Sequence, residues 1–71
     1  MNTDHLIKMA NEIAAFFATE SGSGLAAQDV AAHLKKFWEA RMRREIVAHY
    51  RQGGAGLSDI ARGAVELLAK E

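Results

Sequence analysis

The apolar side chains between residues 25 and 51 change direction partway along the sequence, and this shift limits the folds open to the chain. No proline interrupts the stretch, so its composition alone would allow one long helix. On a wheel of about 100° per residue that starts at Val30, Leu34, Phe37 and Trp38 lie within about 80° of zero, whereas Ile46 lies at about 160°. A single straight helix would therefore bury charged side chains or leave half of its apolar face exposed.

We expect the chain to resolve this conflict by a kink or break near Glu39–Arg41. The stretch then forms two helices, at about 25–38 and 41–51, each with one apolar stripe. One continuous helix that lies across two partners is the structural alternative.

The remaining segments predict two more helices. Residues 4–18 carry apolar side chains at steps of three and four, behind the N-cap candidates Asn2 and Thr3. Glycines at 53–56 end the preceding helix, and Ser58 is a plausible N-cap for a last amphipathic helix at about 58–70. Strand-like alternation and internal repeats are lacking. The sequence thus predicts an all-α fold, a small bundle of three to four short helices.

Length and charge narrow the classes of function. With 71 residues and no cysteine, the chain has room for one domain, residues 1–71, and no disulfide to stabilise it. Small domains of this kind often depend on oligomerisation or on a partner. The formal net charge is zero, so we expect neither nucleic acid nor a membrane as the partner. The zero total hides a basic segment, residues 33–51, with six Lys and Arg against two Glu.

The sequence also indicates a location. It starts with polar residues rather than a signal peptide. No stretch approaches the roughly 20 apolar residues that a membrane span needs. We therefore expect a cytoplasmic protein.

No residue pattern predicts catalysis, cofactor binding or a metal site. The histidines His5, His33 and His49 lack the spacing of a ligand pair with another histidine or a carboxylate. The serines lie in loop or cap contexts rather than in a nucleophile motif. The glycines at 53–56 do not follow a strand, as a phosphate-binding loop requires. We expect no catalytic residue, no cofactor and no metal in this chain.

The basic and aromatic residues around position 40 form the candidate binding site. Trp, Tyr and Arg dominate the energetics of protein interfaces, and Met is enriched there. Arginine can also grip partner carboxylates through paired hydrogen bonds. The candidate partner-binding residues are Lys35, Trp38, Arg41, Met42, Arg43 and Arg44.

Two other interpretations of this segment stay open. The first is a solvated basic face over a core that contains Phe37 and Trp38. The second is a small nucleic-acid-binding regulator, in which residues 57–68 would form one helix of a helix-turn-helix. The neutral total charge disfavours the second, and the last helix has only Arg62 and Lys70 as bases.

Three stretches resemble a known family: HLIKMANEIAAFF at 5–17, VAAHLKKFWEARMRREIVAH at 30–49 and GGAGLSDIARGAVELL at 53–68. The sequence is similar to the delta subunit of soluble NAD-dependent formate dehydrogenases that contain molybdenum or tungsten. The likeness covers nearly the whole chain in the same order. In that family a proline usually stands between the tryptophan and the Arg-Met pair, whereas this chain has Ala40. The predicted break therefore depends on the shift of the apolar stripe alone.

The resemblance implies a role within a larger enzyme. Complexes of this family oxidise formate to carbon dioxide and reduce NAD. Their large (alpha) subunit holds a molybdopterin guanine dinucleotide cofactor and iron–sulfur clusters, and another subunit holds the flavin and the NAD site. The delta subunit is a small accessory protein without a cofactor of its own.

For this chain the resemblance implies a non-catalytic subunit that docks on the large subunit and supports assembly or stability of the complex. An assembly factor that handles the pterin cofactor is the alternative. A partner surface left uncovered would also favour a homodimer of the isolated chain.

Overall fold

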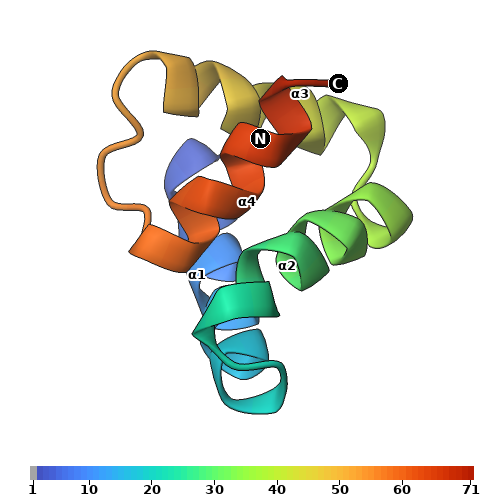
Figure 1. Ribbon diagram of the computed structural model, residues 1–71. Coiled ribbons are helices and arrows are strands. Elements are labelled where there is room, and N and C mark those ends of the chain that lie inside the picture. Colours follow the sequence, from blue (N-terminus) through green and yellow to red (C-terminus); the bar gives the residue numbers. More distant parts are fainter. Residues whose placement is uncertain (1) are drawn as a thin grey trace.

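The computed structural model describes residues 2–71, which form four helices joined by short connections (Figure 1). These residues contain no strand, so the predicted all-α bundle of short helices is confirmed. None of the four helices combines the length and the hydropathy that a bilayer-spanning segment needs. The helices are α1 (Thr3–Glu20), α2 (Ser23–Phe37), α3 (Ala40–Arg51) and α4 (Asp59–Ala69), and their bounds lie within two residues of the predicted ones.

Two helices start at the caps that the sequence predicts. The side-chain oxygen of Asn2 accepts a hydrogen bond from the backbone N–H of Asp4 at 2.8 Å, at the start of α1. The hydroxyl of Ser58 accepts one from the N–H of Ala61 at 3.3 Å, at the start of α4. Each cap satisfies an N–H group that has no partner within the helix. The other predicted candidate, Thr3, lies inside α1, where its hydroxyl donates to Glu45 of α3.

The core lies where all four helices meet. α2 and α4 pack most extensively against each other, and they approach closely because small residues face each other. A Cβ atom at Gly63 would lie 3.3 Å from the Cβ of Ala27. The largest fully buried side chains are Leu6, Val30, Leu34, Ile46 and Val65.

The predicted break between the second and third helices is confirmed, and it lies at Trp38 and Glu39. Both residues have extended backbone, with ψ angles of 139° and 154°. α2 closes with a hydrogen bond from the N–H of Trp38 to the carbonyl oxygen of Leu34 at 2.9 Å. Ala40 is the first residue of α3, which is the helix position that accepts proline without loss of a hydrogen bond.

The connection between α3 and α4 turns through glycines, as the sequence predicts. Gly54 has a φ angle of +64° and is buried. A Cβ atom at this position would lie 2.9 Å from the guanidinium of Arg62, which donates to the carbonyl oxygens of Gly53 and Gly54, each at 3.0 Å. Both the backbone conformation and the close approach of Arg62 therefore favour glycine.

Candidate functional site

The six candidate partner-binding residues do not form one exposed surface. Trp38 is only 5% exposed and belongs to the buried core. The backbone at Trp38 and Glu39 is extended, and the indole lies in the core at the end of α2. Met42 is half-buried and packs against the same core. Lys35, Arg41 and Arg44 are exposed.

Arg43 holds the corner between α2 and α3. Its Nη1 donates to the carbonyl oxygen of Lys35 at 3.2 Å and also to that of Trp38. These carbonyls lie at the C-terminal end of α2, where the helix itself supplies no N–H partner and its dipole favours a cation. The side chain is half-buried. Arg43 therefore stabilises the corner from which α3 departs.

A basic cleft lies along α3 beside the C-terminal ends of α2 and α4, with a volume of about 680 Å³. Three of the candidate residues, Lys35, Arg43 and Arg44, line it together with Arg51, a cation that was not among the predicted ones. The single acidic residue in its lining is Glu71. An excess of cations in a concave site attracts anionic groups. The apolar part of the lining consists of Ala40, Val47, Ala48, Leu68 and Ala69.

Two contacts lie within the basic cleft. The Nζ atom of Lys35 lies 2.6 Å from a carboxylate oxygen of Glu71. The guanidinium of Arg51 donates to the carbonyl oxygen of Ala69 at 3.2 Å. Both contacts tie the C-terminal end of α4 to the neighbouring helices. They also leave the basic side chains gathered at one end of the bundle.

An aromatic row crosses from α1 to α2 on the surface. We define it as Phe16, Phe17, His33 and Phe37, whose successive ring centroids lie 5.2, 5.9 and 4.7 Å apart. Phe16 is 58% exposed and Phe37 is 65% exposed. A hollow of about 360 Å³ adjoins the row and is lined by Met9, Glu12, Ile13, Phe16, Phe17 and His33.

The aromatic row was not predicted, because the apolar stripes place all three phenylalanines in the core. The interpretation of the basic segment as a solvated face over a core of Phe37 and Trp38 is correct for Trp38, which is buried. It is wrong for Phe37, which is exposed. A sequence signal for the row did exist. Phe16 and Phe17 are neighbours, about 100° apart on a helix, so at most one of them points to the centre of the core. His33 and Phe37 are four residues apart and therefore share one side of α2.

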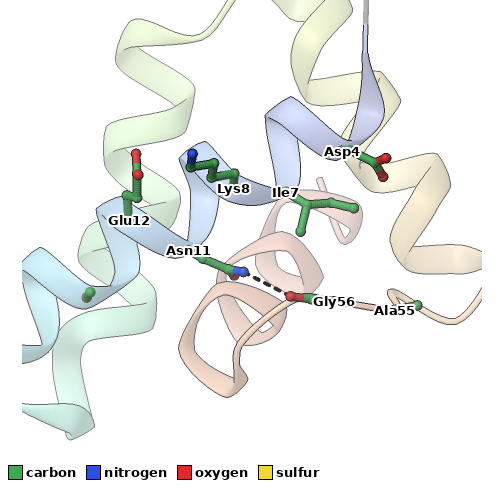
Figure 2. A pocket seen from close by; sticks show the side chains of 8 residues that line it. Asp4, Ile7, Lys8, Asn11, Glu12, Ala55 and Gly56 are labelled. Atoms are coloured by element: carbon green, nitrogen blue, oxygen red, sulfur yellow. Dashed lines mark hydrogen bonds between the residues drawn. The ribbon is translucent and has the colours of Figure 1, made fainter.

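Asn11 lies at a third hollow, of about 620 Å³, between α1 and the connection that precedes α4 (Figure 2). Its side-chain nitrogen donates to the carbonyl oxygen of Gly56 at 2.9 Å. Its side-chain oxygen accepts from the backbone N–H of Ser58, also at 2.9 Å. The two bonds use both ends of one amide to hold the connection on α1. Asn11 thus has a structural task that accounts for its position.

Two of the three histidines have identified neighbours within the chain. His33 belongs to the aromatic row, and Nε2 of His49 lies 2.7 Å from the carbonyl oxygen of Ala55. Within residues 2–71, no three His, Cys, Asp or Glu side chains gather in a group that could hold a metal ion.

The bases of α4 are engaged within the chain. The guanidinium of Arg62 donates to carbonyl oxygens of the connection that precedes α4. The Nζ atom of Lys70, just after the helix, lies 3.6 Å from a carboxylate oxygen of Glu66. A recognition helix of a helix-turn-helix instead directs its bases toward DNA. This arrangement disfavours the nucleic-acid-binding alternative.

Taken together, these features define a small protein of the all-α class, with four helices and with an aromatic row and a basic cleft on its surface. A family model described as NADH-dependant formate dehydrogenase delta subunit FdsD matches residues 5–65. Because this match spans most of the 71 residues, the chain belongs to the family of formate dehydrogenase delta subunits. The resemblance drawn from the sequence is thereby confirmed. Neither a curated protein nor a solved structure gave a significant match.

Proposed function

We propose that this chain is a non-catalytic accessory subunit of a NAD-dependent formate dehydrogenase. It docks on the large subunit, which holds the molybdopterin cofactor, and supports the assembly or stability of the active complex. The observation that carries this proposal is the family match over residues 5–65.

The aromatic row supports docking as the task of the chain. Exposed apolar groups that lie side by side mark interaction sites more often than scattered ones do. Phe16 and Phe37 would gain about 25 cal/mol for each Å² that a partner removes from water. The hollow beside the row offers space for an apolar side chain of that partner.

The candidate residues divide between direct and indirect roles in this proposal. Lys35, Arg41 and Arg44 are exposed and can contact the partner. Arg43 orients α3 through its bonds to the end of α2. Trp38 and Met42 have an indirect role, because their packing in and against the core supports the helices that present the exposed cations.

Co-purification with the large subunit tests this proposal. The complex is expressed with an affinity tag on the large subunit, together with the wild-type chain or with the double variant Phe16→Ser/Phe37→Ser. The double variant loses the exposed part of the aromatic row and should be recovered at about a tenth of the wild-type amount or less, since hot-spot aromatics contribute about 2 kcal/mol or more each. Circular dichroism verifies that the helices persist.

A matched control is Leu25→Ser, which removes another exposed apolar side chain of α2. Leu25 is 56% exposed and belongs neither to the aromatic row nor to the lining of its hollow. This variant should be recovered with the complex as the wild type is. Absence of the wild-type chain from the purified complex would refute the proposal.

The cytoplasmic location and the homodimer of the isolated chain stay predictions. The aromatic row gives the homodimer a specific basis, because two copies could cover it mutually. Docking on the large subunit would then compete with self-association.

A further inference from the structure

We infer that the basic cleft binds an acidic segment of the subunit on which the chain docks, and that Glu71 occupies part of this site until the partner displaces it. This inference rests on the proposed function. It assigns an occupant to a surface that is separate from the aromatic row.

Charge complementarity is the first argument. The cleft lining contains Lys35, Arg43, Arg44 and Arg51 but only one acidic residue, Glu71, so the cleft has a surplus of positive charge. A guanidinium has five N–H donors. The bonds of Arg43 and Arg51 within the chain each use one terminal nitrogen, and the remaining donors can bind carboxylate oxygens in pairs.

The lining of the basic cleft is the second argument. Val47 and Leu68 are among the apolar residues that line the cleft together with the cations. A bare phosphate would gain nothing from such surface, whereas a peptide could place an apolar side chain there and its acidic side chains on the cations. A volume of about 680 Å³ has room for several side chains. We therefore assign the cleft to an acidic peptide segment of the partner.

Glu71 provides the third argument. Its carboxylate lies 2.6 Å from the Nζ atom of Lys35, which shows how the cleft receives a carboxylate. The side chains of Lys35 and Glu71 are 48% and 54% exposed. Ion pairs this exposed are weak, so a partner that brings several carboxylates can replace this one.

The test measures the affinity of the full-length chain for a formate dehydrogenase complex purified without it. Arg44→Glu reverses a charge on the cleft and should weaken binding by about tenfold, because an attraction becomes a repulsion. Lys8→Glu makes the same charge reversal on an exposed residue of α1 outside the cleft lining. Its effect should be several times smaller.

A second pair of variants tests the role of Glu71. Glu71→Gln removes the internal competitor and should tighten binding, whereas a purely structural role would leave the affinity unchanged or lower it. Glu66→Gln is the control, since Glu66 pairs with Lys70 and does not line the cleft. This control should bind as the wild type does.

The outcomes separate this inference from the proposed function. If the wild type binds and Arg44→Glu binds equally well, the inference is overturned and the proposed function stands. If the wild type does not bind at all, both fail. Micromolar binding of inorganic pyrophosphate to the free chain, lost in Arg44→Glu while docking persists, would assign the cleft to a phosphate-bearing ligand and overturn the peptide assignment.

Discussion

The guanidinium of Arg43 donates a hydrogen bond to the carbonyl oxygen of Trp38, across the break between α2 and α3. The bond joins a basic residue of α3 to the residue whose indole is buried in the core. It explains why not every cation of the basic segment is exposed to solvent. One arginine of the segment fixes the corner, while its neighbours Arg41 and Arg44 remain exposed.

Arg43→Ala should lower the free energy of unfolding by about 1–2 kcal/mol, since the variant leaves carbonyls at the end of α2 without their charged donor. Urea denaturation followed by circular dichroism measures the change. Arg41→Ala on the same helix is the control and should stay within about 0.5 kcal/mol of the wild type. Equal effects of the two variants would contradict the role of Arg43.

Trp38→Ala should destabilise the chain by about 3–5 kcal/mol, as removal of a buried aromatic side chain does. Phe37→Ala, one residue earlier, removes a side chain that is 65% exposed, and should cost less than about 1 kcal/mol. Denaturant titration compares the two variants. A larger loss of stability for Phe37→Ala would mean that Phe37, and not Trp38, is the buried residue.

Ala40→Pro should stabilise the chain by about 0.4–1 kcal/mol, because proline restricts the unfolded chain. The position suits it, since Ala40 starts α3 and Glu39 before it has φ −64° and ψ 154°, which a following proline requires. Ala48→Pro, inside the same helix, should instead cost about 3 kcal/mol or more. Thermal unfolding measures both changes: the melting temperature should rise in Ala40→Pro and fall in Ala48→Pro. A lower melting temperature of Ala40→Pro would argue against the observed start of α3.

Asn11→Ala should cost about 1–2 kcal/mol, because it removes one hydrogen bond to Gly56 and another from Ser58. Asn11→Asp keeps the acceptor for the N–H of Ser58 but sets a carboxylate oxygen against the carbonyl oxygen of Gly56, so its cost should be similar. Urea denaturation gives both values. Hydrogen exchange at the Ser58 amide should accelerate in Asn11→Ala alone, and equal exchange in all three proteins would count against the bond.

The helices could be predicted from the sequence because their signals are local. The caps at Asn2 and Ser58, the glycines before α4 and the shift of the apolar stripe at Glu39 all act within a few residues. Whether a side chain at the break is buried or exposed could not be predicted from such local signals. A wheel assumes helical geometry through Trp38, whereas the backbone there is extended.

The surfaces were predictable only in part, for a related reason. The basic composition of residues 33–51 indicated cations, but it did not show that Arg43 bonds to the end of α2 or that Arg51 joins the cleft across from Ala69. The aromatic row depends on Phe17 of α1 meeting His33 of α2. Contacts between residues this far apart in the sequence follow from helix packing rather than from a local pattern.

Hydroxyl-radical footprinting, read by mass spectrometry on the chain alone and within the purified formate dehydrogenase complex, tests the central claim most directly. We expect Phe16 and Phe37 to react in the isolated chain and to be protected in the complex. Trp38, the one tryptophan of the sequence, should be protected in both. Equal reactivity of Phe16 and Phe37 in the two states, or strong reaction of Trp38 in the isolated chain, would contradict an account in which the partner covers the aromatic row and the indole belongs to the core.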